Sequence, residues 1–213
     1  MAYTGDTTPD TRELPGLVIT KLSVGPMDNN AYLLRCPTTG EQLLIDAANE
    51  PERLLALAGD GGLATVVTTH RHGDHWQALS DVIAATGAES VAHPDDAPNI
   101  PVVTRTVADG DSVRVGDATL DVIHIVGHTP GSIALLYRDP TGHPHLWTGD
   151  SLFPGGVGNT QGDPARFTSL INDVEHKLFD RLPDDTWFYP GHGKDSTLGA
   201  ERPALPEWRE RGW

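Results

Sequence analysis

The chain has 213 residues, with 30 acidic against 15 basic side chains and a formal net charge of −15 at pH 7. This length suits one domain with a substantial core, and so acidic a chain repels phosphate backbones and anionic lipid, which argues against nucleic acid and membrane partners. A single cysteine, Cys36, excludes an internal disulfide and is typical of a reducing compartment, so we expect a cytoplasmic protein with a buried structural thiol.

The first half of the chain predicts a polar arm followed by short strands. Residues 1–16 are rich in Pro, Thr and Asp and lack a signal-peptide pattern, so we predict a flexible N-terminal arm and then one domain over 17–213. Apolar runs at 18–20, 31–34 and 43–46, separated by turn residues, predict an antiparallel meander. A helix is expected from Pro51, ended by Gly59, and the β-branched run 65–69 predicts a buried strand.

The second half repeats this pattern of strands and helices. A helix is expected over about 76–86, with Asp74 or His75 near its N-cap and Gly87 beyond its end. Further strands are predicted at 113–115, 119–126, 133–137, 146–148 and 186–189, with a helix beginning at Asp163-Pro164 between the last two. Two successive blocks of this kind predict an α/β domain of two sheets packed face to face, with the helices outside.

One segment concentrates metal-ligand residue types where the predicted strand 65–69 ends: Thr69-His70-Arg71-His72-Gly73-Asp74-His75. Neutral imidazole binds zinc and iron, and a carboxylate supplies the harder oxygen ligand. A His-rich surface loop is the alternative interpretation. The rest of the chain argues against it, because it supplies further residues of the same kind.

Three more segments place a histidine or an aspartate beside glycine at the end of a predicted strand. They are Gly127-His128-Thr129-Pro130-Gly131-Ser132, Thr148-Gly149-Asp150-Ser151 and Pro190-Gly191-His192-Gly193. Taken singly, His128 and Asp150 are better explained by a turn, and His192 is ambiguous. Together the four segments supply seven ligand-type side chains, the number needed for two adjacent metal ions that share one bridging carboxylate.

In this order, the four segments resemble those of the metallo-β-lactamase-fold hydrolases, and within them the glyoxalase II-like (hydroxyacylglutathione hydrolase-like) branch. The resemblance covers about residues 17–205 and implies a four-layer αβ/βα sandwich with the metals at one edge of the two sheets. It implies one metal ion on His70, His72 and His128. It implies a second on Asp74, His75 and His192, with Asp150 bridging the two.

The resemblance also implies a chemistry. The expected cofactors are two divalent metal ions, zinc first and iron or manganese as alternatives, with a metal-bound hydroxide as the nucleophile. Asp74 and Asp150 are the expected catalytic residues, because they would orient the hydroxide toward a carbonyl carbon. A thioester suits such a site, since a thiolate departs without a strong general acid. We therefore expect a metal-dependent hydrolase that acts on a small-molecule thioester or related ester.

Two departures from the glyoxalase II-like pattern leave the thiol carrier open. Members that use glutathione thioesters commonly carry a Gly-Arg or Gly-Lys pair after the bridging aspartate, and Asn159 takes the place of the basic residue here. The chain also ends at Trp213, without room for the helical substrate domain of longer members. The stretch 203–213, with Trp208 and Trp213, is expected to pack over the body or a partner subunit, so a homodimer stays open.

Three other residues have weaker interpretations. Asp46 matches a family position near the site and is predicted either to orient a ligand histidine or to serve the turn. His93 is expected at most at the rim of the site, and Tyr189 is expected to pack in the core.

The same fold and ligand residues would also permit activities other than thioester hydrolysis. A persulfide dioxygenase would use one iron on His70, His128 and Asp150, and a lactonase would share the hydrolytic site. The presence of residues for a second metal favours hydrolysis. A β-lactamase is disfavoured by the missing signal peptide, a nuclease by length and charge, and a non-catalytic metal-binding module is the last alternative.

Overall fold

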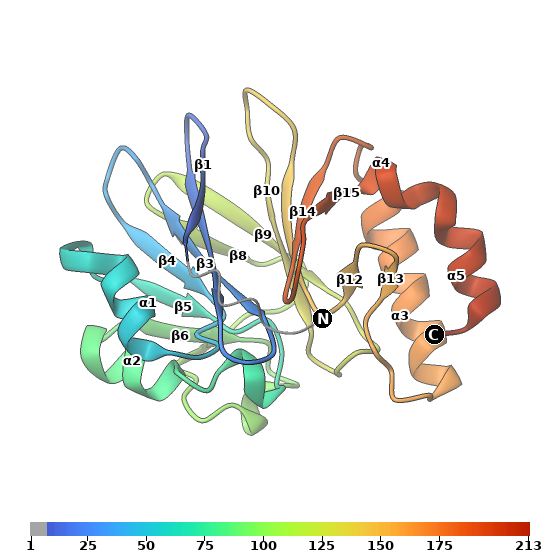
Figure 1. Cartoon of the computed structure of the whole chain (residues 1–213), viewed down its shortest axis with the longest axis horizontal. Coiled ribbons are helices and arrows are strands. Elements are labelled where there is room, and N and C mark those ends of the chain that lie inside the picture. The colour runs from blue at the N-terminus through green and yellow to red at the C-terminus, as the bar shows by residue number, and fades with distance from the viewer. Residues whose placement is uncertain (1–7) are drawn as a thin grey trace.

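A computed structural model describes residues 8–213. Two β-sheets face each other, and helices cover both outer surfaces (Figure 1). Strands β1–β4 of the first sheet pair antiparallel, and β4–β7 pair in parallel. In spatial order the first sheet contains β1 (Asp10–Glu13), β2 (Val18–Val24), β3 (Asn29–Arg35), β4 (Gln42–Ile45), β5 (Thr65–Val67), β6 (Glu89–Ala92) and β7 (Arg105–Thr106).

The second sheet is antiparallel except for one pair, β11 with β14. In spatial order it contains β15 (Ser196–Thr197), β14 (Trp187–Pro190), β11 (His145–Gly149), β10 (Ile133–Tyr137), β9 (Ala118–His124) and β8 (Ser112–Val115). A small hairpin follows β11, made of β12 (Leu152–Phe153) and β13 (Gly156–Val157).

The helices are α1 (Pro51–Ala58), α2 (Leu79–Thr86), α3 (Pro164–Asp173), α4 (Leu198–Glu201) and α5 (Leu205–Arg211). A π-helical segment, Val174–Phe179, continues α3, and 3₁₀ turns cover Gly59–Gly61, Gly73–His75, Ala97–Asn99 and Arg202–Ala204. The start of α3 follows the prediction, because the Asp163 side chain accepts hydrogen bonds from the first backbone N–H groups of the helix.

The start of α2 differs from the prediction. The helix begins at Leu79, and its N-cap residue, Ala78, makes no side-chain cap. The predicted cap by Asp74 or His75 is therefore wrong. Both residues lie in the preceding 3₁₀ turn, where their side chains approach His192 instead of the helix terminus.

Three separate apolar cores establish four layers. The first lies between the two sheets and includes Tyr32, Leu135 and Trp147. The second joins the first sheet to α1 and α2, around Leu44 and Val82. The third joins the second sheet to α3 and α5; it includes Leu146, Phe188, Leu170 and Trp208. This is the α/β four-layer sandwich that the sequence predicts, with α1 and α2 on one outer face and α3, α4 and α5 on the other (Figure 1).

The two ends of the chain correct and extend the predictions. The flexible arm predicted over 1–16 falls partly outside the described residues, and within them Asp10–Glu13 pair with β2 as an edge strand, so that part of the prediction is wrong. At the other end Trp208 is buried against Phe179, whereas Trp213 is exposed. Among residues 8–213, no helix has the length and apolar character needed to cross a membrane.

Candidate metal centre

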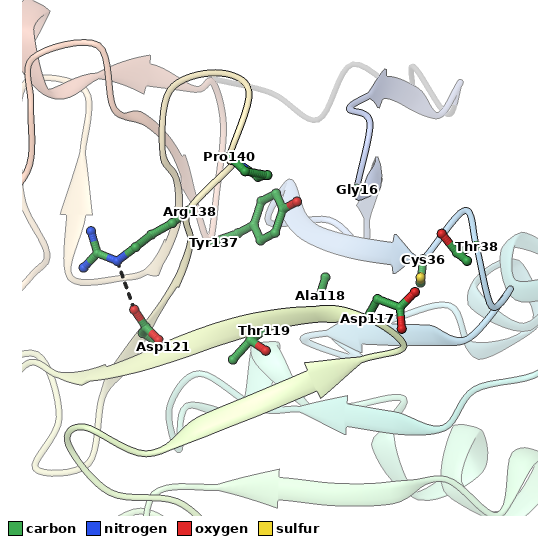
Figure 2. Close-up of a pocket in the computed structure, with 10 residues that line it drawn as sticks. All are labelled: Gly16, Cys36, Thr38, Asp117, Ala118, Thr119, Asp121, Tyr137, Arg138 and Pro140. Carbon is green, nitrogen blue, oxygen red and sulfur yellow. Dashed lines mark hydrogen bonds and ion pairs between the residues drawn. The ribbon is translucent and has the colours of Figure 1, made fainter.

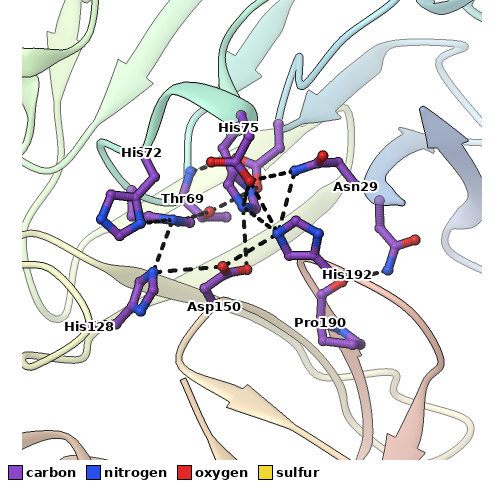
Figure 3. Close-up of polar contacts among 12 residues, drawn as sticks. Asn29, Thr69, His72, His75, His128, Asp150, Pro190 and His192 are labelled. Atoms are coloured by element: carbon purple, nitrogen blue, oxygen red, sulfur yellow. Dashed lines mark hydrogen bonds and ion pairs between the residues drawn. The ribbon is translucent and has the colours of Figure 1, made fainter. Parts of the chain in front are cut away.

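All seven predicted ligand residues lie together at one edge of the sandwich, on loops that follow strands of both sheets (Figure 3). The loop after β5 supplies the first four, and the loops after β9, β11 and β14 supply one each. The sheets are joined directly here, since the N–H of Ile133 on β10 donates to the Thr69 carbonyl at 2.9 Å.

The first cluster consists of three imidazoles. The His70 Nε2 atom lies 3.1 Å from His72 Nδ1 and 3.3 Å from His128 Nε2. The rings of His72 and His128 approach to 4.5 Å between centroids and are nearly perpendicular. All three rings therefore direct a nitrogen toward one point.

The second cluster combines two imidazoles with a carboxylate. The Nε2 atoms of His75 and His192 lie 3.3 Å apart, and Asp74 Oδ2 lies 3.5 Å from the first and 3.3 Å from the second. Asn29 donates to the same Asp74 oxygen at 2.9 Å and so fixes the carboxylate.

Asp150 lies between the clusters and faces both. Its Oδ1 atom is 3.3 Å from His75 Nε2, and its Oδ2 atom is 3.7 Å from His128 Nε2 and 3.5 Å from His192 Nε2. Oδ1 is buried without a conventional hydrogen-bond partner among the described residues. Buried carboxylate oxygens are rarely left in this state, so this atom is suited to a cation.

The spacing of these atoms tests whether the clusters fit metal ions. In a tetrahedral site with bonds of about 2.0 Å to each ligand, neighbouring ligand atoms lie about 3.3 Å apart. The contacts within each cluster are 3.1–3.5 Å. Most of these contacts join acceptor-type atoms, which a shared cation explains and mutual hydrogen bonding does not. The clusters can therefore hold metal ions.

Outer contacts set which ring nitrogen faces the centre. The Nδ1 atoms of His75, His128 and His192 point away from it, toward Asp46 Oδ2 (2.8 Å), the Asn159 carbonyl (2.8 Å) and the Met27 carbonyl (2.9 Å), respectively. If each Nδ1–H donates to its oxygen partner, each Nε2 lone pair is left for a metal ion. This is the usual arrangement around metal-binding histidines.

Asp46 combines the two roles that the sequence leaves open. Its φ of 58° places it in the left-handed region at the end of β4, a conformation that Asp tolerates. Its buried carboxylate accepts from the Thr69 N–H at 2.7 Å and the Thr69 hydroxyl at 2.8 Å, in addition to contacting His75. Asp46 thus serves the turn and orients a candidate ligand.

A close approach at the centre explains one of the glycines beside the candidate ligands. A Cβ atom on Gly191 would lie 2.2 Å from Asp150 Oδ1 and 2.6 Å from His75 Cε1. Any larger residue would displace both side chains, so glycine permits the His192 loop to close over the centre.

Electrostatics at the site favour ionised carboxylates. Burial opposes ionisation of Asp150, but the neighbouring His75 holds the pKa of that carboxyl well below its usual value. Burial lowers the pKa of His128 to about 4. Burial would lower the pKa of His192 too, but its contacts with Asp150 and Asp74 outweigh this and raise it to about 10. The first cluster thus consists of histidines whose burial favours the neutral, metal-binding form.

Sequence reasoning missed the residues that hold the His192 loop in place. Asn30 donates to the carbonyls of Pro190 (2.9 Å) and Gly193 (3.0 Å), and the Tyr32 hydroxyl donates to the Pro190 carbonyl at 2.6 Å. The available signal was the Asn29-Asn30 pair directly before the apolar run 31–34. These side chains attach the second half of the chain to β3.

His93 and Tyr189 lie apart from the seven residues. The His93 ring stacks on His124 at 3.9 Å, near Asp95, in a separate group. Tyr189 packs between the sheets, and its hydroxyl lies 2.9 Å from His145 Nδ1. The core role predicted for Tyr189 is confirmed.

Cys36 is buried, as predicted, and lies at the end of β3 opposite to Asn29. It borders a cavity of about 440 Å³ whose wall also includes Tyr137 and Asp117 (Figure 2). A hydrogen bond from the Thr39 side chain lowers the pKa of the Cys36 thiol to about 7. This cavity is distant from the metal-ligand residues along β3 and contains none of them.

The layers and the two clusters define the class of protein: an αβ/βα sandwich with a candidate dinuclear metal centre at one edge of its sheets. Residues 24–192 match the family model of the metallo-beta-lactamase superfamily. The chain belongs to this superfamily, as its motifs predict.

Individual relatives agree with this assignment. A hydroxyacylglutathione hydrolase of Polaromonas sp. strain JS666 is 41% identical over 167 residues, which cover 77% of this chain and 62% of that protein. The chain thus spans less than two thirds of the length of this relative. Two crystal structures are similar. ETHE1 from Myxococcus xanthus has a TM-score of 0.78 and 28% identity, covering 90% of this chain and 84% of that one. TTHA1623 in a di-iron-bound form has a TM-score of 0.71 and 32% identity, covering 85% of this chain and 96% of that one.

Proposed function

We propose that this protein is a dinuclear metal-dependent hydrolase that cleaves thioesters. The observation that carries the proposal is the position of Asp150, whose two carboxylate oxygens face His75 on one side and His128 and His192 on the other. His70, His72 and His128 would hold one ion, and Asp74, His75 and His192 the other, with Asp150 shared. A relative of 32% identity has been solved with two iron ions, and another carries the name of a thioester hydrolase, which supports this assignment.

Bound divalent ions would lower the pKa of bound water to about 7 and polarise a substrate carbonyl, with zinc as our first expectation and iron or manganese as alternatives. The protein side chains would position the attacking water and orient it toward the substrate carbonyl. Asp74 is held by Asn29 and would accept a proton from the attacking water. Asp150 would fix the direction of attack from the opposite side.

A thioester fits the groups that the site offers. Thiols have pKa values near 8.5, so a thiolate leaves without a strong acid to protonate it. The nearest phenol along the His192 segment, Tyr189, is committed to His145 inside the core and does not serve as that acid. The thiol carrier is open to test, with glutathione among the candidates. We also propose a cytoplasmic location, since a lone buried cysteine suits a reducing compartment; cell fractionation tests it.

The test is a substrate panel on protein of measured metal content. We expect two metal ions per chain and hydrolysis of one or more thioesters of glutathione, coenzyme A or N-acetylcysteamine. Asp150→Asn should lower kcat/KM by more than about 100-fold with the fold intact. Asp60→Asn, at an exposed turn, should leave it unchanged. Turnover of lactones but not thioesters would redirect the proposal to a lactonase.

The second candidate is a persulfide dioxygenase with one iron on His70, His128 and Asp150. The similarity to ETHE1 from Myxococcus xanthus favours it, and the convergence of Asp74, His75 and His192 opposes it, because one iron does not need them. One iron per chain, with oxygen uptake on glutathione persulfide and no thioester turnover, would establish this activity in place of hydrolysis.

A further inference from the structure

A groove lies beside the metal centre, on the side of His72 and His128. Its volume is about 420 Å³, and its wall includes Arg71, Gly127, Thr129 and Arg166. Arg71 stands between His70 and His72 in the chain, and Gly127 and Thr129 flank His128. The loops that present the first cluster therefore present their neighbouring residues to this groove.

The Arg71 guanidinium is available to a ligand. Within residues 8–213 it donates no hydrogen bond, and its one ion pair, to Asp96, is long, with 3.9 Å between Nε and Oδ1. The buried Asp96 carboxylate is already satisfied by the Arg71 backbone N–H (3.0 Å), the Thr129 hydroxyl (2.6 Å) and the Gly131 N–H (2.9 Å). The Arg71 side chain is 37% exposed, so its donors can reach a bound group.

The Arg166 guanidinium is fixed on the other wall. Its Nε donates to the Gly127 carbonyl at 2.9 Å, one terminal nitrogen contacts the His128 carbonyl, and the other donates to Gln161 at 3.0 Å. Guanidinium has five N–H donors, so these three bonds leave two. Arg166 is thus a positioned cation that also holds the backbone of a candidate ligand.

The glycine between these walls keeps the groove closely packed. Gly127 has a φ of 144°, and a Cβ atom there would lie 2.5 Å from Leu170 Cβ and 2.6 Å from the Arg166 carbonyl oxygen. The loop therefore packs directly on α3. A rigid support of this kind reduces the ordering cost when a ligand binds.

The charge of the groove contrasts with that of the chain. The protein carries 30 acidic and 15 basic side chains, yet two arginines and no acidic residue line this groove. Two nearby carboxylates are engaged by the protein itself: the buried Asp96 accepts three hydrogen bonds from the surrounding loops, and Asp163 caps α3. A guanidinium group matches the planar shape of a carboxylate, which it binds through two parallel hydrogen bonds.

We propose that this groove binds a carboxylate of the substrate while the thioester carbonyl lies at the metal centre. The inference rests on the proposed function and deepens it, because it defines the substrates as anionic thioesters. Arg71 and Arg166 would also supply, at another position, the positive charge that glutathione-using members carry where this chain has Asn159. The carboxylate can belong to the acyl part or to the thiol part, and the two sources are separable by experiment.

The experiment compares kcat/KM within two matched pairs of thioesters. Succinyl against butyryl N-acetylcysteamine places the carboxylate on the acyl side. Acetyl N-acetylcysteine against acetyl N-acetylcysteamine places it on the thiol side. We expect the wild-type protein to prefer the anionic member of one pair and Arg71→Gln to reduce that preference about tenfold. Arg71→Lys should retain part of this preference. Arg114→Gln, at an exposed position of the edge strand β8, should retain all of it. A preference unaffected by Arg71→Gln in both pairs would overturn the proposal.

A direct measurement separates failure of the groove from failure of the proposed function. Binding of succinate to the full-length metal-loaded protein, followed by calorimetry, should be about tenfold weaker in Arg71→Gln, since any binding at the metal ions is common to both proteins. If no thioester is hydrolysed but this difference is present, the groove stands and the proposed reaction fails. Equal succinate affinity in both proteins contradicts the groove.

Discussion

Asp46→Asn is the sharpest test of how the centre is organised. The substitution keeps the size of the side chain, and asparagine tolerates the left-handed backbone of this position, where φ is 58°. The only chemical change is the replacement of one carboxylate oxygen by an NH₂ group. That carboxylate accepts three hydrogen bonds, two from Thr69 and one from His75.

An amide cannot satisfy these three donors together. If its nitrogen replaces Oδ1, it faces the buried Thr69 N–H, which loses its acceptor at a cost of about 1–3 kcal/mol. If it replaces Oδ2, it faces His75 Nδ1, which must then be the acceptor. The proton moves to Nε2, the nitrogen that faces Asp74, Asp150 and His192. Metal affinity then falls by roughly 10- to 100-fold, as for other partners of ligand histidines.

Two measurements on the Asp46→Asn protein detect either orientation of the amide. Urea unfolding of the metal-free form gives the change in stability, and competition with a chelator gives the change in metal affinity. We expect the two losses to total about 2 kcal/mol, because one orientation or the other must be adopted. Asp60→Asn, at an exposed turn, is the control and should change neither the stability nor the metal affinity. A variant whose stability and metal affinity both match those of wild type would refute the assigned role of Asp46.

Three further predictions concern other parts of the molecule. Gly191→Ala should abolish metal binding, because the added Cβ collides with Asp150. Gly73→Ala is the control and should retain both ions, because no atom lies closer than 3.8 Å to its added Cβ. The measurement is the metal content per chain after dialysis. Trp208→Ala should lower the free energy of unfolding by about 3–5 kcal/mol and the exposed Trp213→Ala by less than about 0.5 kcal/mol; equal effects would contradict the assigned packing of α5. Burial lowers the pKa of His145 to about 4, so protonation of the unfolded chain destabilises the fold as the pH falls below about 6.5. Wild type should lose about 2 kcal/mol more than His145→Gln between pH 7 and pH 5, and parallel pH profiles of unfolding would exclude this contribution.

The sequence predicted the layers because its strands and helices carry strong periodic patterns. The apolar run at 43–46 and the helical spacing after Asp163 correspond to β4 and α3. Short elements escaped prediction. The edge strand Asp10–Glu13 contains no apolar residue, and its pairing with β2 is a tertiary effect that no local pattern reports.

The candidate site, too, has parts that the sequence predicts and parts that it does not. Its seven principal side chains were predictable, since histidine and aspartate next to glycine at strand ends form a recognisable motif. The parts supplied by the backbone were not. The carbonyls of Met27 and Asn159 contact the rings of His192 and His128, and every residue type has a carbonyl. Arg71 likewise looks like a spacer between two histidines until the fold places it opposite Arg166.

The parallel pairing of β14 with β11 has a consequence for biosynthesis. Translation delivers six of the seven candidate ligands before the chain reaches β14, and α3 is made in between. Until β14 docks, one edge of β11 is unpaired, and Asn30 and Tyr32 lack the Pro190 carbonyl to which they donate. A nascent or truncated chain thus exposes a strand edge of the kind that promotes aggregation. The last candidate ligand, His192, arrives with the strand that covers this edge, so a chain that holds both metal ions is one in which β14 has docked.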